Sequence, residues 1–104
     1  MMIARWSIDA KFGYKQNVID AMQKWAREIA PQIGWTADKM RLLTGSIGAL
    51  EATMQSEVVI RDLAELHQSW EKLATIEGHK QFSKDIEPYV VSGTNRWEIY
   101  RVLE

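Results

Sequence analysis

The chain has 104 residues, of which 46% are hydrophobic and 26% are charged. This length and balance predict a single globular domain over residues 1–104 and exclude a disordered chain. Thirteen basic and fourteen acidic side chains give a net charge of −1, so no basic surplus indicates nucleic acid or an anionic membrane as a partner. The sequence contains no cysteine, which excludes disulfides, thiolate nucleophiles and metal sites built on thiolates.

The sequence also carries no sign of membrane insertion or export. No apolar run approaches the ~18 residues that a membrane-spanning helix needs. The N-terminal residues lack the basic, apolar and small-residue order of a signal sequence. We therefore expect a cytoplasmic protein without a membrane partner.

The first part of the chain predicts a strand and then a helix. Residues 2–10 alternate in polarity, and Trp6 and Ile8 stand on the apolar side of this strand. A helix is expected over about 14–30, and Pro31 ends it. Apolar residues recur in this helix at steps of three and four: Val18, Met22, Trp25 and Ile29.

Two strands are expected next, over about 37–46 and 49–59. The segment Gly45-Ser46-Ile47-Gly48 between them is typical of a hairpin, so the two strands should be antiparallel. Cations on the first strand and anions on the second, such as Arg41 and Glu57, predict ion pairs across the hairpin.

The C-terminal part predicts two more helices and a last strand. The first helix should cover 62–76, with Asp62 as its N-cap and an acidic residue three positions on. Gly78 should interrupt this helix before a shorter one at about 79–87. The last strand is expected to run from Arg96 to Leu103.

This element order, β-α-β-β-α-α-β, is that of a ferredoxin-like α+β sandwich. The fold places an antiparallel four-stranded sheet under helices that cover one face only. The other face mixes charged and apolar side chains: Arg5, Lys39, Arg41, Glu51, Glu57, Glu98, Ile3, Leu43 and Val59. Such a face is typical of a solvated sheet and equally of two sheets packed across a two-fold axis, and the element order favours neither.

Four C-terminal segments resemble the dimeric α+β barrel superfamily, which includes antibiotic-biosynthesis-type monooxygenases, NIPSNAP-like proteins and stress-responsive barrel proteins. The segments are Trp70-Glu71-Lys72-Leu73, Gly78-His79-Lys80-Gln81-Phe82, Ile86-Glu87-Pro88-Tyr89-Val90 and Arg96-Trp97-Glu98-Ile99-Tyr100-Arg101-Val102. The element order matches as well. The resemblance implies a homodimer whose two sheets close a dimeric α/β barrel, with a pocket in each subunit between its sheet and its helices.

Three tryptophans are expected to face the space between the sheet and the helices, namely Trp6, Trp25 and Trp70. Together with Phe82 they form a candidate wall for a small hydrophobic or aromatic ligand, because flat rings stack and bury well. The alternative is an aromatic-rich core in which these side chains only pack on one another. Composition and spacing leave both interpretations open.

His79 is the candidate base or haem ligand of the chain. Haem-degrading members of the superfamily use a histidine in about this helix, a tryptophan one helical segment earlier and an asparagine on the first strand. His79 and Trp70 are similar to the first two, whereas the first strand offers Ser7 and Asp9 instead of the asparagine. We therefore expect no cofactor, with haem as the alternative, and no metal site, because no clustered ligand spacing occurs. The ordinary alternative for His79 is a partly exposed histidine near a helix start.

The resemblance to quinol-type monooxygenases implies a reaction without metal or flavin, in which an electron-rich aromatic or polyketide-like substrate reacts with oxygen. The protein would position the substrate, supply a base and stabilise an anion. His79 and Tyr100 are the catalytic candidates, and structural ion pairs are the ordinary explanation for the charges around them. A non-enzymatic stress-responsive or binding barrel and a haem-degrading monooxygenase are the two alternatives. Whether the chain is an enzyme stays open.

Overall fold

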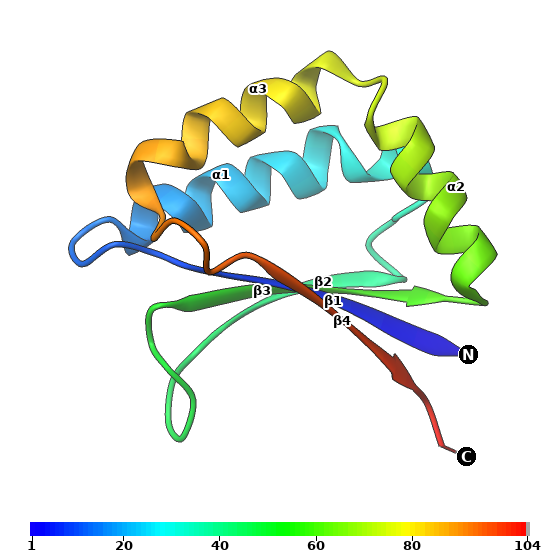
Figure 1. Ribbon diagram of the computed structural model, residues 1–104, viewed down its shortest axis with the longest axis horizontal. Helices are drawn as coiled ribbons and strands as arrows, with labels where there is room; N and C mark the ends of the chain where they lie inside the picture. Colours follow the sequence, from blue (N-terminus) through cyan, green and yellow to red (C-terminus); the bar gives the residue numbers. More distant parts are fainter. Residues whose placement is uncertain (104) are drawn as a thin grey trace.

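The computed structural model describes residues 1–103 as a four-stranded antiparallel sheet with helices over one face (Figure 1). The strand order is β2-β3-β1-β4, which is the ferredoxin-like α+β arrangement expected from the element order. The elements are β1 (Met2–Asp9), α1 (Lys15–Glu28), η1 (Ala30–Ile33), β2 (Met40–Thr44), β3 (Thr53–Ile60), α2 (Leu63–Leu73), α3 (Glu77–Ile86), η2 (Glu87–Tyr89) and β4 (Arg96–Arg101), where η denotes a 3-10 turn.

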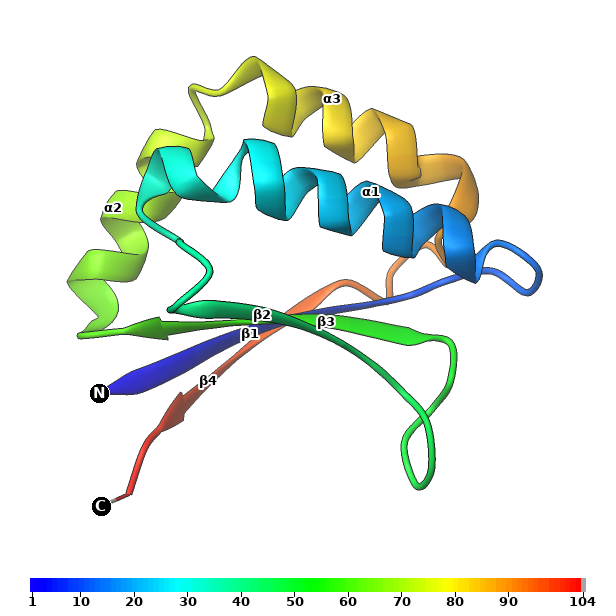
Figure 2. The same ribbon diagram turned by 180° about the vertical axis from the view of Figure 1, so that it is seen from behind.

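The helices form a single layer above the sheet. Helices α1 and α3 lie side by side, and α2 lies at one end of the layer, beyond the end of β3 (Figures 1 and 2). The β2–β3 loop projects from the opposite side of the sheet, away from the helices (Figure 2). Within residues 1–103, no helix is long and apolar enough to cross a membrane.

Strand alternation sorts the side chains onto the two faces of the sheet. Ala4 and Ile8 are buried under the helices, as the period of two predicts. The buried apolar side chains form two clusters, one around Leu66 at the α2 end and one around Met22 beneath α1. The candidate site described below borders both clusters.

The hairpin strands are shorter than expected, β2 covering Met40–Thr44 and β3 covering Thr53–Ile60. The prediction of 37–46 and 49–59 was wrong at the inner ends because the chain turns back on itself between the strands, and wrong at the start of the first strand because residues 37–39 form a turn. A Cβ atom on Gly45 would lie 1.6 Å from the carbonyl oxygen of Leu50, so the backbones cross too closely there for a regular ladder. The helix predicted over 14–30 also ends earlier, because Pro31 lies in the 3-10 turn that follows it.

The prediction that Gly78 breaks a helix was wrong. Helix α2 ends at Leu73, and Gly78 lies in the first turn of α3. A Cβ atom on Gly78 would lie 2.5 Å from Cδ1 of Ile29, so glycine here allows α3 to approach the end of α1 closely. The predicted cap of α2 is confirmed, because Asp62 Oδ1 accepts a hydrogen bond from the backbone N–H of Glu65 at 2.9 Å.

A row of alternating charges crosses the uncovered face of the sheet, with one residue from each strand in register: Arg41, Glu57, Arg5 and Glu98. Glu57 Oε1 accepts from Arg5 Nε at 2.8 Å, and its Oε2 accepts from Arg41 Nε at 2.9 Å, which confirms the ion pair predicted across the hairpin. Burial raises the pKa of Glu57, but the hydrogen bonds from Arg41 and Arg5 outweigh it and hold this pKa below its usual value.

A tryptophan-lined cavity as the candidate functional site

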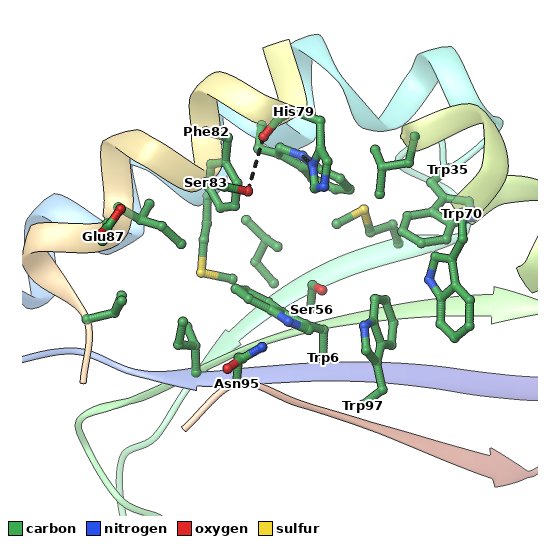
Figure 3. Close-up of a pocket in the computed structure, with 18 of the residues that line it drawn as sticks. Trp6, Trp35, Ser56, Trp70, His79, Phe82, Ser83, Glu87, Asn95 and Trp97 are labelled. Atoms are coloured by element: carbon green, nitrogen blue, oxygen red, sulfur yellow. Dashed lines mark hydrogen bonds between the residues drawn. The ribbon is translucent and has the colours of Figure 1, made fainter. Parts of the chain in front are cut away.

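A cavity of about 680 Å³ lies between the sheet and the helices (Figure 3). This volume is within the range of small-molecule sites, roughly 300–1,000 Å³. The chain has five tryptophans, and every one of them lines this cavity: Trp6, Trp25, Trp35, Trp70 and Trp97. A side-chain type that is rare in proteins is thus concentrated entirely at one site.

Each tryptophan is positioned by the element that carries it. Trp6 and Trp97 are cross-strand partners on β1 and β4, and both face the helices. Trp25 comes from α1 and Trp70 from α2. Trp35 follows Gly34, whose φ of +81° turns the chain so that the Trp35 N–H donates to the carbonyl of Ala30 at 3.0 Å.

Three indoles form a compact wall at the α2 end of the cavity. The ring centroid of Trp97 lies 5.3 Å from that of Trp70 and 6.3 Å from that of Trp35, and both contacts are edge-to-face. The ring N–H groups of Trp35 and Trp70 are buried with no hydrogen-bond acceptor among residues 1–103. The edge-to-face contacts themselves are favourable, because the positive edge of one ring lies against the negative face of another.

The helical roof of the cavity, on the side of α1 and α3, is formed by Trp25, His79 and Phe82. The indole N–H of Trp25 donates to Nδ1 of His79 at 3.0 Å, and the His79 ring stacks on Phe82 with their planes 21° apart. Burial lowers the pKa of His79, which favours the neutral ring. Because an indole nitrogen only donates, Nδ1 must hold the lone pair and Nε2 must carry the proton.

Few polar groups complete the lining. Among residues 1–103, no lysine or arginine lines the cavity, and the one charged lining residue is Glu87. Figure 3 shows Glu87 on the α3 side, far from the wall of Trp35, Trp70 and Trp97. Across the described part of the chain, no three His, Cys, Asp or Glu side chains gather to hold a metal ion. The remaining polar side chains are hydroxyls and an amide, from Ser56, Ser83, Ser92 and Asn95.

The structure brings five of the six predicted site residues to this cavity: Trp6, Trp25, Trp70, His79 and Phe82. Tyr100 is separated from them. It lies three residues after Trp97 on the same strand, so it faces the other side of the sheet. There its hydroxyl donates to Glu98 Oε2 at 3.2 Å, and its ring lies under the Arg5 guanidinium, 4.8 Å from ring centroid to Cζ.

Two of the lining tryptophans, Trp97 and Trp35, were not predicted from the sequence. Trp97 becomes identifiable once β4 is placed beside β1, because that register sets it opposite Trp6. Trp35 lies in a connection without periodicity, and no sequence signal marks its inward direction.

No family model and no curated protein matches this chain. Solved structures do. A NIPSNAP family protein from Agrobacterium tumefaciens superposes with a TM-score of 0.81 at 14% identity, covering 99% of this chain and 86% of its own. A NIPSNAP-like domain protein from Burkholderia xenovorans gives 0.79 at 14% identity, covering 98% and 84%. An antibiotic biosynthesis monooxygenase gives 0.71 at 10% identity, covering 100% of both chains. These likenesses confirm the ferredoxin-like α+β fold of the single chain.

Proposed function

We propose that the cavity of this chain binds a flat, uncharged aromatic small molecule. The chain has the fold of NIPSNAP family proteins and antibiotic biosynthesis monooxygenases. The observation that carries this proposal is the gathering of all five tryptophans around one cavity of about 680 Å³. A core that only needed filling would use these rings to close the space. Here they surround it, and aromatic walls favour a flat apolar guest.

Intrinsic tryptophan fluorescence, excited at a wavelength that tyrosine does not absorb, tests this proposal, because every tryptophan of the chain borders the cavity. Saturable quenching by neutral naphthalene or anthracene derivatives is expected. Ser56 is half-buried on the cavity floor beside Trp6, so Ser56→Leu should fill part of the space and weaken binding about tenfold or more. Gln68→Leu, at an exposed position on α2, is the matched control. Equal affinity in the two variants, or no saturable quenching, would refute the site.

A second proposal is that the bound molecule reacts with oxygen without a cofactor, as a monooxygenase of the antibiotic-biosynthesis type would. It is supported by the fold likeness and by the aromatic, weakly polar lining. For a substrate of the anthrone type, the ring CH₂ and O₂ give C=O and H₂O, with the substrate supplying all the electrons. The neutral His79 in this geometry donates from Nε2, so its part would be to stabilise a developing oxyanion rather than to accept a proton.

Oxygen uptake with anthrone as substrate tests this activity. We expect uptake above the buffer rate and a loss of about tenfold or more in His79→Leu, since one oxyanion donor is typically worth that much or more. Binding without uptake would instead establish the non-enzymatic binding barrel, the alternative that the sequence left open.

Haem fits this site poorly. Iron binds the lone pair of a histidine nitrogen, yet Nε2 of His79 carries the proton while Nδ1 accepts from Trp25. Ligation by His79 would require breaking that bond. The lining residues among 1–103 also include no lysine or arginine to pair with haem propionates.

We also propose that a second copy of the chain covers the open face of the sheet. Val59 is 37% and Tyr100 42% exposed there, on either side of the half-buried Ile3. The charge row carries both signs, so two copies related by a two-fold axis can pair cation with anion. The β2–β3 loop, with exposed Ile47 and Leu50, projects beyond this face (Figure 1).

Sedimentation equilibrium tests the dimer. We expect twice the chain mass at micromolar concentration, and dissociation in Val59→Lys, which sets unpaired charge on the covered face. Lys24→Glu, at an exposed position on α1, should stay dimeric. A wild-type monomer under these conditions would contradict the proposal.

A further inference from the structure

The two nitrogens of the His79 imidazole have different surroundings. Nδ1 accepts the hydrogen bond from the indole of Trp25. Nε2 has no hydrogen-bond partner among residues 1–103. It is also not one of the fully buried side-chain atoms without a partner, so part of its surface is exposed. It is therefore accessible to solvent or to a ligand, and His79 itself lines the cavity. Figure 3 shows the residue in the roof, across the cavity from Trp6.

The bond from Trp25 determines what the free nitrogen can do. A neutral imidazole has one N–H and one lone pair, and the indole N–H claims the lone pair at Nδ1. Nε2 must then carry the hydrogen, so His79, a residue of the lining, offers a donor to a ligand that reaches Nε2. A ligand group that accepts a hydrogen bond, such as a carbonyl oxygen, is therefore complementary to this donor.

The donor is held in place by its neighbours. The His79 ring stacks on Phe82 with a centroid separation of 6.4 Å. The Trp25 ring that fixes it packs in turn against Trp35 and Phe82, each at a centroid separation of 6.1 Å. A donor whose orientation is set before binding loses little entropy when a ligand pairs with it.

The charge of the lining restricts the ligand acceptor further. A carboxylate would lose its hydration without gaining a lysine or arginine partner, because none lines the cavity within residues 1–103. It would also share the cavity with the carboxylate of Glu87. An uncharged carbonyl oxygen needs only the single donor that His79 offers.

We infer that His79, held by Trp25 as a fixed Nε2–H donor, makes this cavity selective for aromatic compounds with an uncharged carbonyl group over aromatic carboxylates. The inference rests on the proposed binding function and names the ligand class of that site. His79 is the specificity-determining residue, and Trp25 is the residue that positions it.

Nitrogen NMR tests the first half without any ligand. The chain has two histidines, so His67→Gln leaves the His79 imidazole as the single histidine signal. At pH 7.5 we expect the neutral ring with the proton on Nε2. Trp25→Phe removes the indole donor and should give a mixture of both tautomers. Protonated Nδ1 in the parent variant, or no change on Trp25→Phe, would overturn the inference.

Three probes of one shape test the second half: 2-acetylnaphthalene, the hydrocarbon 2-isopropenylnaphthalene, and 2-naphthoate. We expect the ketone to bind about threefold to tenfold more tightly than the hydrocarbon, the ordinary value of one hydrogen bond, and the carboxylate to bind most weakly. His79→Leu should abolish the preference for the ketone, and His79→Gln, which keeps an N–H donor, should restore part of it. A circular dichroism spectrum of each variant verifies that it folds.

The outcomes separate the two proposals. Equal binding of ketone and hydrocarbon, or tight binding of 2-naphthoate, would overturn the selectivity while leaving the aromatic site in place. No saturable binding of any of the three would overturn the proposed function, and the selectivity with it. A preference for the ketone that survives His79→Leu would move the donor to another residue and so refute the role of His79.

Discussion

Trp6 and Trp97 lie directly opposite each other on β1 and β4, and both side chains face the helices. This cross-strand pair forms the floor of the cavity, whereas Trp25 and Trp70 enter from helices and Trp35 from the connection before β2. Because the pair sits on adjacent hydrogen-bonded strands, its geometry is set by the sheet rather than by side-chain packing alone. The sheet thus supplies a rigid floor beneath a helical roof.

Trp70→Ala should lower the free energy of unfolding by about 1–3 kcal/mol, below the 3–5 kcal/mol typical of a fully buried tryptophan. The ring is half-buried, borders the cavity, and packs on Trp97 on one side. Urea denaturation measures the change. A loss above about 4 kcal/mol would mean that Trp70 belongs to a closed core and not to a cavity wall.

Glu57→Gln should lower the free energy of unfolding by about 1–3 kcal/mol at pH 7, because it removes the carboxylate between Arg5 and Arg41. The loss of stability stays moderate because the Arg41 side chain is largely exposed, so water can hydrate its guanidinium when the carboxylate is removed. Glu51→Gln, whose carboxylate is almost fully exposed beside Lys15, should change little.

The effect of Glu57 should depend on pH. Its pKa in the folded protein is lowered, so the unfolded chain binds a proton first as the pH falls. The stabilisation is complete above the usual glutamate pKa of about 4.3 and declines as the pH falls through the folded value. Denaturation series from pH 7 to pH 3 should therefore show the gap between wild type and Glu57→Gln closing. A constant gap would contradict the ion pairs.

The stability of the wild type should also fall between about pH 7 and pH 5 through His79. Burial lowers the pKa of this imidazole in the folded state, so below the ordinary value of about 6.5 the unfolded chain takes up the proton more readily. Protonation also removes the lone pair that accepts from Trp25. The slope should be smaller in His79→Gln than in the wild type; equal slopes in the two proteins would exclude this explanation.

Gly78→Ala should destabilise the protein by about 1 kcal/mol, although alanine is the better helix former. The added methyl would lie 2.5 Å from Cδ1 of Ile29, which is buried. Ile29→Val removes that Cδ1 atom, so the double variant should be more stable than the sum of the two single changes implies. Additive losses in thermal or urea unfolding would show that the two residues do not meet.

Periodicity correctly predicted the features that are determined within a single strand or helix. The alternation of β1 placed Trp6 and Ile8 on the correct face, and the helical stripe placed Trp25 toward the sheet. The cap at Asp62 followed from a local hydrogen bond, so it too was visible in the sequence.

The rest depends on contacts between distant elements. Gly78 looks like a helix breaker by its conformational freedom, whereas its role is set by Ile29, which only the fold brings near. Tyr100 was grouped with His79 as a catalytic candidate on the resemblance to quinol-type monooxygenases, but the sheet lies between them. Trp35 is directed by the turn at Gly34 and a single backbone hydrogen bond, a signal too short for any period.

The most direct test of the ligand site is a two-dimensional ¹H–¹⁵N NMR titration that follows the five indole N–H cross-peaks, since each comes from a cavity-lining tryptophan. With 2-acetylnaphthalene added to saturation, the account predicts shifts at Trp6, Trp25 and Trp97 and little change at the methyl groups of Val59, whose side chain lies on the opposite face of the sheet. Indole cross-peaks that stay fixed, or shifts centred on Val59, would contradict it.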